Sequence, residues 1–70
     1  MARKIYYGSW SANNCSTYAG GYEYTNKRTA RREMRDMALS NVFAHNTGHW
    51  DVMDGDGEIL ASGSVRNAGR

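Results

Sequence analysis

The sequence lacks proline and contains a single cysteine in 70 residues. No internal disulfide can form, which excludes a disulfide-stapled secreted domain and favours a reducing, cytoplasmic environment. No apolar run approaches the length of about 20 residues that a membrane span needs, and no apolar signal segment follows the basic N-terminus. We therefore expect one small soluble domain over residues 1–70 that does not contact a membrane.

Residue types that support catalysis or metal binding are also scarce. His45 and His49 lie far from Cys15 in the sequence, and the three have no zinc-ligand spacing. The stretch from Asp54 to Glu58 resembles the middle of an EF-hand loop, but the aligned loop has neither the first acidic ligand nor the bidentate glutamate. No glycine-rich phosphate-binding motif is present. We expect a non-enzymatic protein without metal or cofactor.

Four segments have the composition of β-strands. Lys4–Trp10 is rich in aromatic residues, and Tyr18–Tyr24 holds three tyrosines around Gly20-Gly21, where we expect a bulge or a bend. Gly48–Met53 and Glu58–Val65 flank an Asp-Gly-Asp-Gly turn, a strong hairpin signal because glycine accepts positive φ.

Alternation along the hairpin assigns its side chains to faces. Trp50 and Val52 share one face of the first strand. On the second strand one face carries Ile59, Ala61 and Val65. The last residues of the chain are polar, and we expect residues 65–70 to form a frayed tail.

One helix is expected between the two strand pairs, from a cap at Thr25 or Asn26 to about Ala44. It should stop near Asn46-Thr47-Gly48, because glycine is common just past a helix end. The stripe expected to face the sheet comprises Ala30, Met34, Met37, Ala38 and Asn41. The order is β-β-α-β-β, an α+β fold with one helix on a mainly antiparallel four-stranded sheet.

Charge is unevenly distributed, although the net charge is only +2. Residues 1–35 carry seven basic and two acidic residues, whereas residues 36–70 carry two basic and five acidic ones. Five of the basic residues begin the expected helix, where cations are unfavourable: Lys27, Arg28, Arg31, Arg32 and Arg35. Departures of this kind from local rules mark functional surfaces. These residues are our candidate contacts to an acidic protein surface or to phosphates, and a merely solvated face is the alternative.

Leu39 and Phe43 lie on the arginine side of the expected helix, opposite Ala30 and Met34. Either the helix bends or ends early near Ser40-Asn41 and buries them in the core, or they form a second apolar surface beside Arg32 and Arg35. Apolar, aromatic and Arg residues together are typical of interface hot spots, and a homodimer seam fits equally well. The eight aromatic residues fill a small core economically, but adjacent Tyr6 and Tyr7 point to opposite strand faces, so we expect one to be exposed as an anchor.

Two resemblances extend these expectations. Gly21-Tyr22-Glu23-Tyr24-Thr25 with Ala30, and Gly48–Val52 with Gly57-Glu58-Ile59, resemble AP2-type and phage-integrase arm-binding DNA domains, whose hairpin precedes the helix, whereas here it follows. In size and layout the chain also resembles small phage-encoded inhibitors of host machinery, including anti-CRISPR proteins. The second resemblance implies a protein that blocks a host protein or nucleoprotein complex, such as a CRISPR effector, by surface contact in the host cytoplasm.

The leading hypothesis is therefore a protein-binding inhibitor or regulator that uses the basic helix face. The alternative is a small nucleic-acid-binding protein. It would use the same arginines for phosphates and Tyr6, Tyr7 or Trp10 for base stacking.

Overall fold

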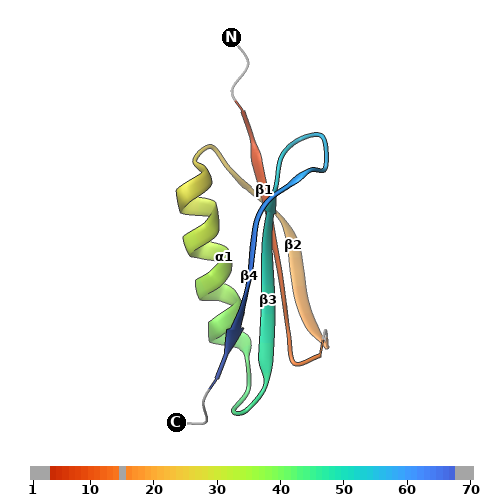
Figure 1. Ribbon diagram of the computed structural model, residues 1–70, viewed down its shortest axis with the longest axis vertical. Coiled ribbons are helices and arrows are strands. Elements are labelled where there is room, and N and C mark those ends of the chain that lie inside the picture. Colours follow the sequence, from red (N-terminus) through yellow and green to blue (C-terminus); the bar gives the residue numbers. More distant parts are fainter. Residues whose placement is uncertain (1–3, 15, 68–70) are drawn as a thin grey trace.

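The structure, a computed structural model, describes residues 4–14 and 16–67. One helix covers one face of a four-stranded sheet (Figure 1), so the predicted α+β fold and its element order are confirmed. The elements are β1 (Tyr6–Ala12), β2 (Thr17–Tyr24), α1 (Lys27–Asn41), β3 (Thr47–Met53) and β4 (Ile59–Arg66). The helix of the described part of the chain is too short and too polar to cross a membrane.

The sheet has the strand order β2-β1-β3-β4, and every neighbouring pair is antiparallel. The chain leaves β2, passes through α1 over the sheet and returns as β3 on the far side of β1. Trp10 of β1 therefore lies opposite Trp50 of β3 in the centre of the sheet. This order makes β2 and β4 the two edge strands.

A β-bulge interrupts the β1–β2 pairing at the glycine pair. Gly8 lies opposite Tyr22 and Trp10 lies opposite Ala19, so Gly20 and Gly21 together oppose the single residue between Gly8 and Trp10. Gly21 has φ +77°, which a residue with a side chain rarely adopts. The predicted irregularity at Gly20-Gly21, a bulge or a bend, is therefore a bulge.

The core lies between α1 and the covered face of the sheet. Its buried members are Trp10, Ala12, Ala30, Met34, Ala38, Val42, Trp50 and Val52. A Cβ atom placed on Gly8 would lie 2.6 Å from Met34 Cγ, so this glycine lets the helix approach β1 closely. Burying a side chain of the size of Met34 or Val52 contributes about 1.5–3 kcal/mol.

The helix begins as predicted but ends earlier. The Asn26 side chain accepts a hydrogen bond from the Thr29 amide at 3.1 Å and caps the N-terminus. The predicted end near Ala44 is wrong, and the alternative of an early end near Ser40-Asn41 is confirmed, because α1 ends at Asn41 and Val42 turns into extended backbone. Asn41 is exposed and not part of the buried stripe, since its side chain donates to the Met37 carbonyl.

Asn13 explains this early end. It lies in the β1–β2 turn with φ 56° and is only 7% exposed. Its Nδ2 donates to the Asn41 carbonyl at 2.9 Å, and its Oδ1 accepts from the Phe43 amide at 2.9 Å. These bonds satisfy backbone groups that a continuing helix would pair internally. A side chain 28 residues away thus ends the helix.

The β3–β4 hairpin forms as predicted, with one difference of register. The Asp54 carboxylate accepts from the amides of Asp56 and Glu58 at 2.9 and 3.0 Å, which closes the turn. Val52 pairs with Ala61 but Met53 pairs with Ile59, so Leu60 is an extra residue. The predicted grouping of Ile59 with Ala61 and Val65 is therefore wrong.

The consequence of this irregularity is visible in the exposure of the strand. Ile59 is 59% exposed, while Ala61 and Val65 pack against the core. β4 continues through Arg66, two residues into the segment expected to fray. Asn67 donates to the Val42 carbonyl at 3.0 Å and ties the end of the strand to the helix C-terminus.

Candidate binding surface

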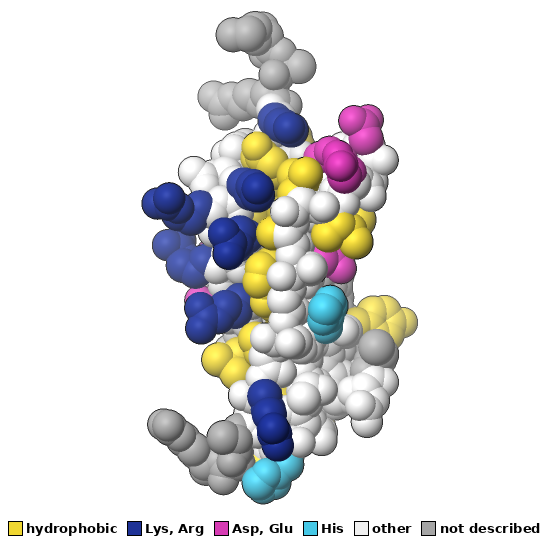
Figure 2. All heavy atoms as spheres, viewed as in Figure 1, with side chains coloured by type: hydrophobic (Ala, Val, Ile, Leu, Met, Phe, Trp, Pro, Cys, Tyr) yellow, Lys and Arg dark blue, Asp and Glu magenta, His cyan; other side chains and the backbone are white. Residues whose placement is uncertain are grey.

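The basic residues at the start of α1 all remain exposed, namely Lys27, Arg28, Arg31, Arg32 and Arg35. We call them the basic face. Their positions follow from the helix repeat, because Ala30, Met34 and Ala38 turn toward the sheet and leave the arginines on the flank and outer surface. Figure 2 shows the dark blue side chains gathered over α1.

No side chain of the basic face forms an ion pair within the described residues. Asp36, four residues after Arg32, does not pair with it. Glu33 is turned to the other flank, where its Oε1 accepts from the Tyr24 hydroxyl at 3.4 Å. The first turn of α1 contains no acidic residue. No ion pair among the described residues therefore neutralises the positive charge of this surface.

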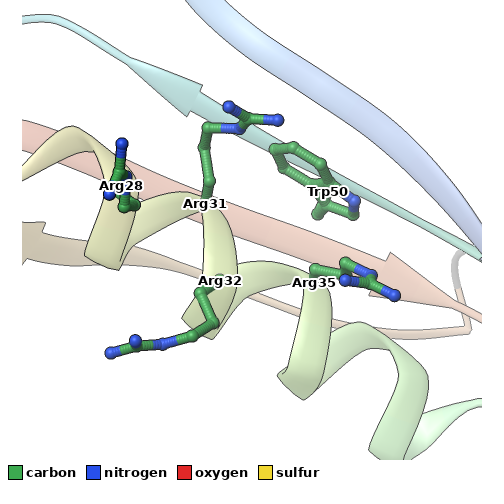
Figure 3. Close-up of a pocket in the computed structure, with 5 residues that line it drawn as sticks. All are labelled: Arg28, Arg31, Arg32, Arg35 and Trp50. Carbon is green, nitrogen blue, oxygen red and sulfur yellow. The ribbon is translucent and has the colours of Figure 1, made fainter.

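Four of the arginines line a shallow groove together with Trp50, with a volume of about 200 Å³. We call this groove, lined by Arg28, Arg31, Arg32, Arg35 and Trp50, the arginine groove. Arg31 and Arg35 extend from α1 to either side of the indole, whereas Arg28 and Arg32 point away from it (Figure 3). The groove thus joins two cationic side chains to an apolar surface.

Trp50 reaches this groove because of the strand beside it. Gly63 of β4 lies opposite Trp50 in the register. A Cβ atom on Gly63 would lie 2.8 Å from Trp50 Cζ2, so the indole occupies the space that a larger residue would fill. The sequence pattern assigned Trp50 to one face of its strand together with Val52 and did not predict its part in the site. The β3–β4 register was the signal that could have revealed it.

The structure decides between the alternatives left open for Leu39 and Phe43. Leu39 is 42% exposed and Phe43 is 68% exposed, so neither belongs to the core. Val42, between Phe43 and the helix, takes the core position and is 4% exposed. Leu39 follows Arg32 by seven residues and Arg35 by four, which puts it on the same side of α1. An apolar extension therefore continues the basic face toward the C-terminal end of the helix.

Tyr6 and Tyr7 do not line the arginine groove. Tyr6 is partly buried against the core, with the Lys4 ammonium 5.9 Å from its ring centre. Tyr7 is half-buried on the uncovered face of the sheet, opposite Glu23 and Met53. Both tyrosines lie outside the arginine groove, so the predicted cluster of arginines, apolar residues and tyrosines is only partly assembled.

The uncovered face of the sheet is polar. Ser9 donates to the Asp51 carboxylate at 2.5 Å, beside a hollow of about 400 Å³ that Ser11, Tyr18 and His49 also line. Because Asp51 is engaged by Ser9 and not by His49, these groups do not form a Ser-His-Asp relay. Within the described residues no group of three His, Cys, Asp or Glu side chains is placed to hold a metal. Cys15 lies outside the described residues.

Tyr24 has a titrating hydroxyl whose pKa departs from its ordinary value. Burial raises the pKa of its hydroxyl above the ordinary value, and the neighbouring Glu33 carboxylate adds to the effect through its charge and hydrogen bond. This pair lies between β2 and α1, on the flank of the helix away from the arginine groove.

Comparisons with protein-family models, with curated proteins and with solved structures found no match to this chain. Its function is therefore inferred from the geometry and charge of the surface.

Proposed function

We propose that the protein is a non-enzymatic binding module that docks the basic face of α1 on an acidic, partly apolar protein surface. The observation that carries the proposal is the arrangement on α1 and on the two residues that follow it. Five cationic side chains without ion pairs precede two exposed apolar residues, Leu39 and Phe43. Arg beside aromatic and aliphatic anchors is the composition of interface hot spots.

The exposed apolar residues favour a protein partner over a nucleic acid. Phosphates would form favourable electrostatic contacts with the arginines. Burying Leu39 and Phe43, however, gains free energy only against an apolar surface. The nucleic-acid alternative also required Tyr6, Tyr7 or Trp10 for base stacking. Trp10 is 8% exposed and Tyr6 packs on the core, which leaves Tyr7 on the sheet face away from α1.

The expected mode of action is steric. A small domain of this kind would act by occupying a surface that its partner needs for another contact. A host protein or nucleoprotein complex is the expected partner. The chain's resemblance in size and layout to small phage-encoded inhibitors supports this class of target, a CRISPR effector among them.

The test uses charge reversal on the basic face. Full-length protein is used for affinity enrichment, together with Arg32→Glu/Arg35→Glu, Phe43→Ser and the control Arg66→Glu at the end of β4. A partner retained by the wild type and the control but lost by the other two variants supports the proposal, provided that circular dichroism shows both to be folded. Retention of the partner by the charge-reversed variant would overturn it.

A second experiment checks the nucleic-acid alternative. Labelled single- and double-stranded oligonucleotides are titrated at about 50 and 200 mM salt, the range over which phosphate contacts weaken steeply. We expect no binding tighter than about 100 μM, the weak end of non-specific association. Micromolar binding that collapses with salt and with Arg32→Glu/Arg35→Glu would replace the proposed partner with a nucleic acid.

A further inference from the structure

β4 offers an open edge. It pairs with β3 on one side, and no strand of the described chain pairs with its other side. Ala61 to Arg66 pair residue for residue with Val52 to Thr47, so this part of the strand is regular. The opposite edge, β2, is interrupted by the bulge at Gly20-Gly21. A regular edge presents backbone amides and carbonyls to an incoming strand.

The β4 edge also lacks the usual protection. Edge strands are commonly guarded by proline, charged side chains or a bulge in mid-strand. From Ile59 to Val65 the strand contains no charged residue and no proline, and its irregularity lies at the beginning, at Leu60. The side chains in the centre of the strand are small, at Ser62, Gly63 and Ser64, and therefore cover little of its backbone. The backbone of this strand is therefore accessible to another chain.

The arginine groove lies beside this edge. Trp50 sits one strand inward and against Gly63, and Arg31 and Arg35 flank its indole (Figure 3). Figure 2 shows dark blue side chains on one side of a band of apolar side chains, with pale backbone and small side chains on the other. A strand added to β4 would therefore turn one of its faces toward the basic face of α1.

We propose that the segment the protein recognises is an acidic peptide in extended conformation, bound along β4 as a fifth strand. This rests on the proposed function and specifies the partner's contact. Side chains on one face of a strand repeat every second residue, about 6.6 Å apart. Arg31 and Arg35, four residues apart on α1, are offset by about 6 Å along the helix axis. Because α1 runs alongside β4 (Figure 1), carboxylates at alternate peptide positions match consecutive arginines.

Charge also selects this occupant over a second copy of the chain. Pairing β4 with β4 of another copy would bring two basic faces to the same side of one continuous sheet. The positive charges of both copies would then converge on the shared edge, because neither Glu33 nor Asp36 of α1 lines the arginine groove. An acidic strand removes that repulsion and neutralises the arginines.

The test uses a peptide as long as β4, eight residues, with glutamate alternating with threonine and valine. One control has the same composition with its glutamates in a block, and a second has the alternating sequence with N-methylated backbone amides on one edge. Binding to the full-length protein is followed by heteronuclear NMR. We expect slowed amide exchange from Ala61 to Arg66, and a loss of about 10-fold or more in affinity for each control and for Arg31→Ala or Arg35→Ala.

The outcomes separate this inference from the proposed function. Peptide binding without protection of the β4 amides, or equal binding of the N-methylated control, would overturn strand addition. So would dimerisation through β4 in the absence of peptide. These results would leave the proposed function standing, because it is tested separately by the loss of the partner in Arg32→Glu/Arg35→Glu. If that variant keeps its partner while the peptide protects β4, the proposed function fails and the edge remains a peptide site.

Discussion

The indole of Trp50 lies against the backbone of Gly63 on the neighbouring strand, at a distance that leaves no room for a side chain. A Cβ atom at position 63 would lie 2.8 Å from Cζ2 and 2.9 Å from Nε1 of the indole. The apolar floor of the arginine groove thus depends on a missing side chain in β4. This relationship couples the shape of the binding surface to the stability of the fold.

Gly63→Ala should therefore displace Trp50. We expect a loss of about 1–3 kcal/mol in the free energy of unfolding, as for other overpacked sites, because the rigid indole has to move. Urea denaturation followed by circular dichroism measures the loss, and tryptophan fluorescence reports the displacement. Gly55→Ala is the matched control, since nothing lies within 4 Å of a Cβ atom there. Equal stability of the two variants would contradict the close packing of Trp50.

Arg28→Glu should stabilise the protein while weakening its binding. It replaces a cation in the first turn of α1 by an anion and turns the repulsive Arg28–Arg32 pair into an attractive one. The two effects together contribute about 0.5–1 kcal/mol at low salt. Thermal denaturation at low and high salt measures the gain, which should shrink as salt screens it. The thermal stability of Arg28→Gln should lie between those of the wild type and Arg28→Glu. A destabilised Arg28→Glu would show that the arginine has a structural role.

Asn13→Ala should destabilise the C-terminal end of α1. The substitution removes the partners of the Asn41 carbonyl and the Phe43 amide, at a cost of about 2–3 kcal/mol. Chemical denaturation gives the value, and amide exchange should increase at Phe43. Asn14→Ala is the control, because Asn14 has nearly the same φ, 59°, but is exposed. Similar losses in both variants would assign the effect to backbone conformation alone.

Val42 and Phe43 should respond in opposite ways to the same substitution. Val42→Ser puts a hydroxyl into the core and should cost about 2–3 kcal/mol. Phe43→Ser should stay within about 0.5 kcal/mol of the wild type, because its ring is 68% exposed. Thermal denaturation of both variants checks this contrast. A large loss of stability in Phe43→Ser would remove this residue from the list of binding anchors.

The free energy of unfolding should decrease at alkaline pH because of Tyr24. Burial and the Glu33 carboxylate raise the pKa of Tyr24 in the folded state, so folding favours the protonated hydroxyl. The resulting stability is fully present below the unfolded pKa of about 10 and is lost as the pH rises through the folded value. Tyr24→Phe should flatten this alkaline decline, as measured by urea denaturation across the pH range. An unchanged slope would mean that Tyr24 titrates alike in both states.

Local signals in the sequence determined the elements and their order. The Asp-Gly-Asp-Gly turn, the glycine pair in β2 and the Asn26 cap each act within a few residues, and each forms as predicted. The excess of arginines at the start of α1 could be read in the same way, because helix positions follow from spacing alone. These features depend on neighbours along the chain.

Tertiary structure alone decided what surrounds those arginines. The end of α1 depends on Asn13, 28 residues away from Asn41, so Val42 and not Phe43 enters the core. The site of Trp50 depends on a strand register that pairs it with Gly63. The open edge of β4 depends on the strand order, which follows from how the helix crosses the sheet. Each is set by contacts between residues distant in sequence, and no local pattern of residue types specifies them.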